Sequence, residues 1–222
     1  EYTALWASGR LSFQETLRLI RKRAQCMNEA CEKIPGTMAA VLGLNADAID
    51  AAIQGVAGVW VANYNCPGQV VISGTKEGCE KAAIALKEAG AKRVIPLPVY
   101  GAFHSGLMQS AQEALAPYIA KAPLIHSEIG FAMNTPGDLV AHLDEIRRNL
   151  TLQVTSSVRW EQGIRAIEKK GIQLYLEIGC GKALTGFNKK IPVSCPTVSL
   201  EKVADLEGVA LALEAPAERV LV

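Results

Sequence analysis

The sequence has little net charge and no long apolar run. Its 23 Lys and Arg residues are balanced by 22 Asp and Glu residues, so neither nucleic acid nor an anionic membrane surface is expected as the main partner. The longest apolar runs are far shorter than the roughly 18 residues that a membrane-spanning helix needs. Half of the 222 residues (50%) are hydrophobic, which is enough to bury a substantial core. These features predict a soluble globular protein.

The six cysteines lack the spacing of a redox pair or of a metal site. No Cys-x-x-Cys pair is present, and no secretory leader is recognisable. We therefore expect reduced thiols, a cytoplasmic location and no metal site. The cysteines are Cys26, Cys31, Cys66, Cys79, Cys180 and Cys195.

The sequence begins without a helix cap or an initiating methionine. Residues 1–9 have the pattern of a helix already under way, with Gly9 as its C-terminal stop. A second helix is predicted from Phe13 to about Cys31, with Ser12 and Glu15 forming a capping box at its start. Because a natural chain rarely starts inside a helix, we expect that an N-terminal part of the protein is missing from this sequence.

A small subdomain is predicted over residues 35–99. The apolar pattern and the Gly and Pro turns give strand, helix, strand, strand, helix and strand in that order. This β-α-β-β-α-β order is that of a ferredoxin-like unit. The predicted elements are residues 37–44, 47–54, 59–65, 69–74, 76–89 and 93–99.

The flanking residues, 1–34 and 100–222, are predicted to form a second subdomain of the α/β class. Helices that alternate with strands are typical of a mostly parallel sheet. Beyond the subdomain just described, helices are expected over residues 107–120, 139–150, 159–170, 182–189 and 204–214, and strands over residues 129–134, 172–178 and 198–200.

One of the three histidines has a setting typical of catalytic groups. His104 lies between a predicted strand and a predicted helix, and α/β folds present reactive side chains at such turns. One interpretation is a general base poised near neutral pH. The other is a structural hydrogen bond, which is the commoner role of a lone histidine. His126 and His142 are predicted to be exposed surface residues.

No activated nucleophile for His104 is found in the sequence. Ser105 is its neighbour, but adjacent side chains usually point apart, and no Gly-x-Ser-x-Gly elbow is present. Either His104 is not a base, or its partner lies outside this sequence. The segment Gly179–Lys182 follows a predicted strand but lacks the spacing of a phosphate-binding loop, so a tight turn is expected there.

Arg23 admits two interpretations. It accompanies three other basic residues on one predicted helix, and that pattern favours a solvated basic face. A guanidinium can also grip a carboxylate through two parallel hydrogen bonds. By composition Gln153 is an ordinary polar residue, and the segment 63–69 is interpreted first as a hairpin turn.

Six segments carry a more specific signal. They are Glu1-Tyr-Thr-Ala-Leu, Asn63-Tyr-Asn-Cys-Pro-Gly-Gln-Val-Val-Ile-Ser-Gly, Ala89-Gly-Ala-Lys-Arg, Ala102-Phe-His-Ser-Gly-Leu-Met, Ser157-Val-Arg-Trp and Glu177-Ile-Gly-Cys-Gly-Lys-Ala-Leu-Thr-Gly. In this order and spacing they resemble the malonyl-CoA:acyl-carrier-protein transacylases of type II fatty acid synthesis. The resemblance extends to about Leu200, with a poor match over residues 122–131.

The resemblance implies a fold and a reaction. The fold is an α/β-hydrolase-like parallel-sheet core, incomplete at its N-terminus, with an inserted ferredoxin-like subdomain. The reaction is ping-pong transfer of a malonyl group from coenzyme A to the phosphopantetheine thiol of acyl carrier protein. Malonyl-CoA and acyl carrier protein are thus the implied partners, and no cofactor is implied beyond the coenzyme A thioester that is the substrate.

The resemblance also assigns roles by position. His104 matches the general base, Arg23 the clamp on the malonyl carboxylate, and Gln153 the glutamine whose backbone carbonyl orients the histidine. Phe103 matches the malonyl-selective form of its loop, because a bulky ring leaves little room for the methyl branch of methylmalonyl. The family's Gly-His-Ser-Leu-Gly elbow ends immediately before the residue that matches Glu1, so the catalytic serine is implied to lie upstream.

Two positions depart from the family pattern. Tyr100 stands where a small residue is usual, close enough to the site to alter the pocket, and Cys180 stands where Pro is usual.

One alternative function is an inactive remnant that keeps a carrier-protein-binding surface, and another is a related acyltransferase or an acyl hydrolase. Retention of His104, Arg23 and Gln153 argues against the remnant, while Arg23 and Phe103 favour malonyl transfer over other acyl chemistry.

Overall fold

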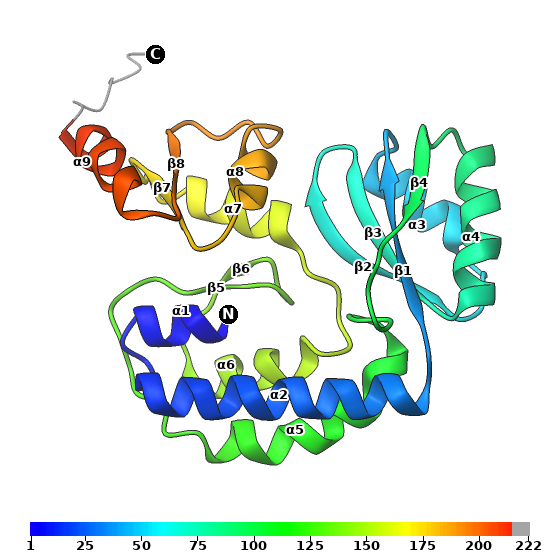
Figure 1. Cartoon of the computed structure of the whole chain (residues 1–222), viewed down its shortest axis with the longest axis horizontal. Coiled ribbons are helices and arrows are strands. Elements are labelled where there is room, and N and C mark those ends of the chain that lie inside the picture. Colours follow the sequence, from blue (N-terminus) through cyan, green and yellow to red (C-terminus); the bar gives the residue numbers. More distant parts are fainter. Residues whose placement is uncertain (215–222) are drawn as a thin grey trace. The chain divides into compact units, whose positions relative to one another are not determined.

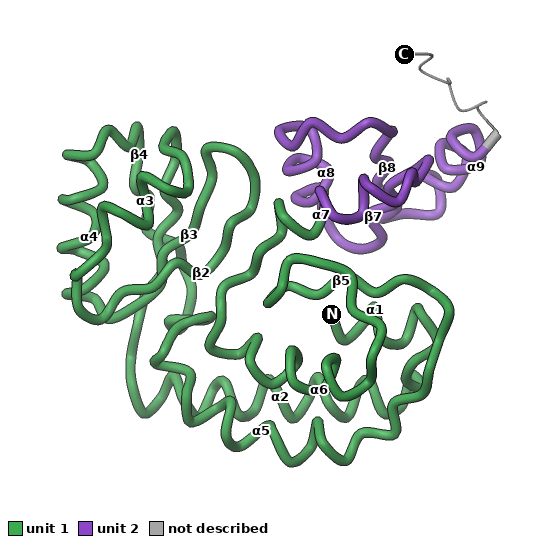
Figure 2. The backbone as a smooth tube through the Cα atoms, turned by 180° about the vertical axis from the view of Figure 1, so that it is seen from behind, with its two compact units in different colours: residues 1–163 green, residues 164–222 purple. Residues whose placement is uncertain are grey.

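The computed structural model describes residues 1–214, which form two compact units (Figures 1 and 2). Unit 1 comprises residues 1–163, and unit 2 begins at residue 164. The predicted division into two subdomains, residues 35–99 and the flanking residues 1–34 and 100–222, stays a prediction. Residues 215–222 of the flanking subdomain lie outside the described residues.

Unit 1 contains a four-stranded antiparallel sheet with the strand order β2-β3-β1-β4. Helices α3 and α4 cover one face of this sheet (Figure 1). The predicted β-α-β-β-α-β order of a ferredoxin-like unit is thereby confirmed. The elements are β1 (Thr37–Leu42), α3 (Ala46–Ile53), β2 (Val59–Cys66), β3 (Gln69–Gly74), α4 (Lys76–Glu88) and β4 (Arg93–Pro96).

The core between the sheet and its two helices follows from the alternation of side chains between the two faces of each strand. Strand β3 buries every residue from Val70 to Gly74, since one face meets the helices and the other meets the rest of unit 1. Ile49 of α3, Ile72 of β3 and Leu86 of α4 are fully buried in this core. Burial of side chains of this size stabilises the fold by about 2 kcal/mol each.

The last strand of the sheet is shorter than predicted. Strand β4 ends at Pro96, whereas the sequence pattern predicted a strand as far as Val99. Pro96 and Pro98 have no N–H to donate to a neighbouring strand, which stops regular pairing. His104 therefore does not follow directly on a strand end, but comes after an irregular segment.

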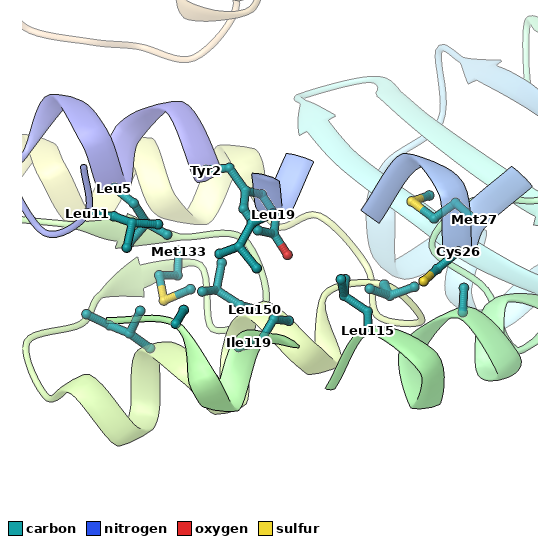
Figure 3. Close-up of a cluster of buried hydrophobic side chains, with 14 of the residues drawn as sticks. Tyr2, Leu5, Leu11, Leu19, Cys26, Met27, Leu115, Ile119, Met133 and Leu150 are labelled. Carbon is teal, nitrogen blue, oxygen red and sulfur yellow. The ribbon is translucent and has the colours of Figure 1, made fainter. Parts of the chain in front are cut away.

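Four helices form the other part of unit 1. They are α1 (Tyr2–Ala7), α2 (Phe13–Lys33), α5 (Gln109–Lys121) and α6 (Leu143–Leu152). Figure 3 shows Tyr2, Leu19, Ile119 and Leu150 directed into one shared apolar core. Helix α2 turns its buried residues toward α5 at spacings of three and four, as expected of an amphipathic helix.

The start of helix α2 is only partly as predicted. The Ser12 Oγ accepts a hydrogen bond from the Glu15 N–H at 3.3 Å, which satisfies one free donor of the first turn. The Glu15 carboxylate does not bond back to the Ser12 N–H, as a full capping box requires, but pairs with Arg18. The capping box is therefore half formed.

The segment after α5 differs most from the prediction. The predicted strand 129–134 is reduced to β5 (Ala132–Met133), which pairs antiparallel with β6 (Asp138–Leu139) across a turn at Gly137. Val140 N–H also donates to Phe131 O, so this hairpin delays the next helix. Helix α6 begins at Leu143, not at residue 139. The helix predicted over residues 107–120 consists of a 3₁₀ turn, η1 (Gly106–Met108), followed by α5.

Unit 2 is built on a parallel strand pair. Strands β7 (Tyr175–Ile178) and β8 (Thr197–Leu200) pair in parallel, with helix α8 (Ala183–Asn188) in the connection. The predicted strand 172–178 is thus confirmed only from Tyr175 onward. The unit also contains the end of α7 (Trp160–Glu168), the 3₁₀ turn η2 (Val203–Asp205) and α9 (Leu206–Glu214).

The Glu177 carboxylate fixes the turn between β7 and α8. It accepts hydrogen bonds from Leu184 N–H, Thr185 N–H and the Thr185 hydroxyl, at 3.0, 2.8 and 2.6 Å. These donors lie at the start of α8, where helix N–H groups have no partner within the helix. The segment Gly179–Lys182 is therefore a turn closed by a carboxylate, as the sequence predicted for a tight turn.

Among residues 1–214, no helix combines the length and the apolar character that crossing a membrane requires.

Candidate active site

In the loop of residues 101–106, His104 has a left-handed backbone conformation, which residues other than glycine rarely adopt. His104 has φ = 57°, and it is the one non-glycine residue with positive φ in the described part of the chain. For an L-residue this left-handed conformation costs about 1–2 kcal/mol, so the surrounding loop has to hold it in place.

Ser105 closes the loop from inside. Its side chain is fully buried, its Oγ donates to Ala102 O at 2.6 Å, and it accepts from Leu107 N–H at 3.2 Å. The hydroxyl is thus hydrogen-bonded to the backbone on both sides of His104. Ser105 is a structural residue of this loop, in line with the expectation that it forms no dyad with His104.

Two glycines let the loop approach its neighbours closely. A Cβ atom on Gly101 would lie 2.1 Å from the Cys31 Sγ, and one on Gly106 would lie 2.7 Å from the Trp60 ring. Both distances are shorter than real Cβ atoms tolerate, so any larger residue would push the loop away. The His104 loop is therefore wedged between helix α2 and strand β2.

His104 is oriented by a backbone carbonyl. Its Nδ1 lies 3.1 Å from the Gln153 carbonyl oxygen, at the C-terminal end of α6. Because a carbonyl oxygen can only accept, Nδ1 must carry a proton, and the neutral imidazole then has its lone pair on Nε2. Both polar contacts of His104 in the described chain, with the carbonyl oxygen and the amide nitrogen of Gln153, involve Nδ1, so Nε2 is free to accept a proton.

The surroundings of His104 favour its neutral form. Burial lowers the pKa of His104 below its ordinary value, and the nearby Arg23 guanidinium lowers it further. The hydrogen bond to the Gln153 carbonyl raises the pKa and only partly offsets these effects. At neutral pH the imidazole is therefore unprotonated, which is the state that a general base requires.

Arg23 differs from the neighbouring arginines on α2. Arg18 and Arg21 are exposed, whereas Arg23 is half-buried. Its Nη2 donates to the Gln153 Oε1 at 3.4 Å, and its guanidinium lies 5.9 Å from the centre of the Tyr2 ring. Its Nε is buried and has no hydrogen-bond partner among the described residues. The Arg23 Nε–H is therefore a buried donor without an acceptor.

Arg23 and His104 line the same pocket, which has a volume of about 380 Å³. Phe103 forms part of its wall and also packs against two hydrophobic clusters of unit 1. The remaining lining residues are Ala24, Met27, Asn28, Met38 and Asn63. One guanidinium, one imidazole and walls that combine apolar side chains with two asparagines suit a small ligand with a negative charge at one end.

A second pocket, of about 390 Å³, is also lined by His104. Its polar wall comes from residues 155–157 and Arg159, which follow Gln153 in the chain, and its apolar wall includes Trp60. Tyr64 donates to the Asp50 carboxylate at 2.8 Å at the edge of this pocket. His104 is the residue shared by both pockets.

The structure thus brings together all four residues that the sequence singled out. Arg23, Phe103, His104 and Gln153 come from α2, the loop and the end of α6. His126 and His142 are exposed, as predicted. Tyr100 is 65% exposed and is not part of either pocket wall.

Two residues at this site had no role predicted from the sequence. Tyr2 lies against the Arg23 guanidinium, and its position at the start of a helix gave no signal of this role. Asn63 was predicted at the end of a strand leading into a hairpin turn, and it does lie within β2, but its role in lining the first pocket was not predicted. A polar residue in a mostly apolar strand could have indicated a lining role.

The chain is similar to known acyltransferases over most of its length. The acyl transferase domain family matches residues 1–185. The malonyl CoA-acyl carrier protein transacylase of Bacillus subtilis is 39% identical over 218 residues, which cover 96% of this chain and 68% of that protein. The protein of the same name from Haemophilus influenzae is 36% identical over 212 residues, covering 94% and 68%.

Solved structures agree with this assignment. The malonyl CoA-acyl carrier protein transacylase of Clostridium perfringens has a TM-score of 0.90 at 36% identity, covering 96% of this chain and 68% of that one. A malonyl transacylase in complex with a type II polyketide synthase acyl carrier protein has a TM-score of 0.87 at 34% identity, covering 93% and 68%. The predicted α/β fold class is confirmed, and the chain belongs to the acyl transferase family, within the group of the malonyl CoA-acyl carrier protein transacylases.

Proposed function

We propose that this chain carries the acyl-binding and proton-transferring residues of a malonyl-CoA:acyl-carrier-protein transacylase of fatty acid synthesis. The names of its relatives support this reaction. The observation that carries the proposal is that Arg23 and His104 line one pocket of about 380 Å³. That pocket offers a cation for the malonyl carboxylate and a base for the reacting end of the same acyl group.

Arg23 binds the carboxylate of the malonyl group. The planar guanidinium matches a carboxylate through two parallel hydrogen bonds, and the unpartnered Nε is one of the donors that such a pair needs. A neutral acyl group such as acetyl would leave this buried donor unsatisfied, which disfavours its binding. Phe103 narrows the pocket and excludes the methyl branch of methylmalonyl.

His104 moves the proton in both half-reactions. Its Nε2 takes the proton of a serine hydroxyl as the serine oxygen bonds to the thioester carbon. When the C–S bond breaks, this proton passes to the coenzyme A sulfur. In the second half-reaction, Nε2 takes the proton of the phosphopantetheine thiol, the thiolate attacks the malonyl-serine ester, and the proton returns to the serine oxygen.

We place the nucleophilic serine outside these 222 residues. Ser105 lies next to His104, but its hydroxyl is buried and bonded to the backbone. The proposal requires no cofactor beyond the coenzyme A thioester itself, and it includes a cytoplasmic location, where malonyl-CoA and reduced thiols coexist.

The test is transfer of radiolabelled malonyl from coenzyme A to holo acyl carrier protein. We compare the 222-residue chain with a protein in which it is preceded by the residues encoded directly upstream. The longer protein should transfer malonyl, and His104→Ala should lower this rate on the order of a thousand-fold or more. A folded longer protein that binds the carrier protein without transferring malonyl would indicate an inactive remnant. Transfer by the 222-residue chain alone would overturn our placement of the serine.

A further inference from the structure

The side chain of Gln153 makes a contact that its backbone role does not explain. Any residue at this position could offer a carbonyl oxygen to His104. Gln153 as a residue is only 4% exposed, however, and its side chain reaches back toward Arg23, 130 positions earlier in the chain. We propose that the Gln153 amide positions the Arg23 guanidinium and so determines selectivity for acyl groups that end in a carboxylate. This inference rests on the proposed function.

The orientation of the amide follows from the chemistry of its neighbours. A guanidinium has donors only, so the atom that faces the Arg23 Nη2 must be the acceptor Oε1. The amide Nε2 then lies 3.1 Å from the His104 Nδ1, whose proton is already directed at the Gln153 carbonyl. The amide nitrogen gains no hydrogen bond there, so the contact with Arg23 is the one that holds the side chain.

A neutral acceptor is the suitable partner for a guanidinium that must bind a substrate carboxylate. Arg23 has no carboxylate partner within ion-pair distance among the described residues. The Gln153 Oε1 holds one nitrogen in place without adding a negative charge at that point. A carboxylate at the same point would pair with Arg23 and compete with the substrate. An apolar side chain would leave the Nη2 without its acceptor.

The same residue therefore serves both ends of the acyl group. Its carbonyl fixes the tautomer of His104, and its amide fixes Arg23, which lines the same pocket. Both groups belong to one buried residue at the end of α6, so the spacing between the base and the carboxylate site depends on a single anchor. Gln153 is a positioning residue, since it acts on the substrate only through Arg23 and His104.

The experiment measures the affinities of the 222-residue chain for malonyl-CoA and acetyl-CoA by isothermal titration calorimetry. The variants are Gln153→Met, which keeps the length but removes the acceptor, and Gln153→Glu, which replaces it with a carboxylate. Gln109→Met is the matched control, because Gln109 is an exposed residue of α5 that bonds Glu113. The His104 tautomer is followed in parallel by ¹⁵N NMR.

We expect Gln153→Met to weaken malonyl-CoA binding about fivefold to twentyfold, with acetyl-CoA binding changed less than about twofold. Gln153→Glu should remove the preference for malonyl-CoA. In both variants the Nδ1 of His104 should stay protonated, because the backbone carbonyl remains. The Gln109→Met chain should behave as the wild type.

Three results would overturn the inference. If Gln153→Met retains the full preference for malonyl-CoA, the amide does not position Arg23, and the proposed function is unaffected. If binding of both thioesters falls equally, or the His104 tautomer changes, the amide has a general structural role instead. If the wild-type chain itself does not prefer malonyl-CoA, Arg23 is not the carboxylate site, and the proposed function fails together with this inference.

Discussion

The Nδ1 atom of His104 lies 3.1 Å from the backbone carbonyl oxygen of Gln153, a residue 49 positions later in the chain. A neutral carbonyl orients the imidazole without placing a negative charge beside it. The charged group that does act on His104 is the Arg23 guanidinium, which disfavours protonation of the ring. The basicity of His104 is therefore coupled to the residue proposed to bind the substrate carboxylate.

This coupling predicts that Arg23→Met raises the pKa of His104. Burial and Arg23 both lower the pKa in the wild type, and the substitution removes the positive charge. As the pH falls, the variant should therefore protonate His104 at a higher pH than the wild type does. NMR titration of the His104 ring protons measures this. Arg21→Met, on the exposed side of the same helix, should leave the pKa unchanged, and an unchanged or lower pKa in Arg23→Met would contradict the prediction.

Arg23 variants should also separate charge from geometry in malonyl-CoA binding. Lysine keeps the charge but loses the planar pair of donors, whereas methionine loses both. We expect malonyl-CoA affinity to fall about tenfold in Arg23→Lys and about a hundredfold in Arg23→Met, with little change for acetyl-CoA. Calorimetry with both thioesters tests this, and equal losses for the two would argue against a carboxylate at Arg23.

The wall formed by Phe103 predicts a change in acyl selectivity. Phe103→Ala removes a ring from the pocket of Arg23 and His104, so a branched acyl group gains space. Binding of methylmalonyl-CoA relative to malonyl-CoA should rise about fivefold or more, since a methylene is worth about 1 kcal/mol or more in a fitted pocket. Tyr100→Ala is the control, because Tyr100 is 65% exposed and lies outside the pocket wall. The same ratio in both variants would show that Phe103 is not the selective wall.

The left-handed backbone at His104 predicts an unusual order of stabilities. His104→Gly and His104→Ala both lose the imidazole, but only glycine adopts φ = 57° without strain. The glycine variant should be more stable by about 1 kcal/mol in urea unfolding. At Glu113, an exposed residue inside helix α5, the order should reverse, because glycine lowers the stability of a helix interior. If alanine is the more stable residue at both positions, the loop does not impose the conformation.

The close approach of Gly101 to Cys31 predicts coupled effects on stability. The Cβ of Gly101→Ala would lie 2.1 Å from the Cys31 Sγ, so either the loop or helix α2 has to shift. We expect a loss of about 1–3 kcal/mol in the free energy of unfolding. In a Cys31→Ala background the loss should be smaller, since the sulfur is gone. Losses that simply add in the double variant would mean that the clash is relieved elsewhere.

Local sequence patterns were sufficient for the sheet subdomain of unit 1. Its strands and helices are each bounded by turn or capping residues, such as Thr75, whose Oγ accepts from Gly78 N–H at the start of α4. The pattern failed over residues 129–150. There the pairing of β5 with β6 and the contact between Val140 and Phe131 decide the structure, and neither follows from the spacing of apolar residues.

The site was only partly predictable for a related reason. The resemblance pointed to His104, Arg23, Phe103 and Gln153, but composition alone gave Gln153 no role. Its two contributions are a backbone carbonyl, which any residue has, and a side-chain contact across 130 positions. Such contacts depend on how helices α2 and α6 pack, and no local motif records that packing.

Each edge of the four-stranded sheet offers only a limited stretch of backbone for further pairing. Outside β2, the segment Ser157–Val158 bonds along the strand, with Tyr64 N–H donating to Val158 O at 2.8 Å and Val158 N–H donating to Ala62 O at 2.7 Å. At the other edge β4 is short and ends in Pro96, which has no N–H to offer. A second copy of the sheet therefore finds only short stretches of free strand edge, which disfavours edge-to-edge pairing of this subdomain. The segment that covers part of the β2 edge begins only four positions after Gln153.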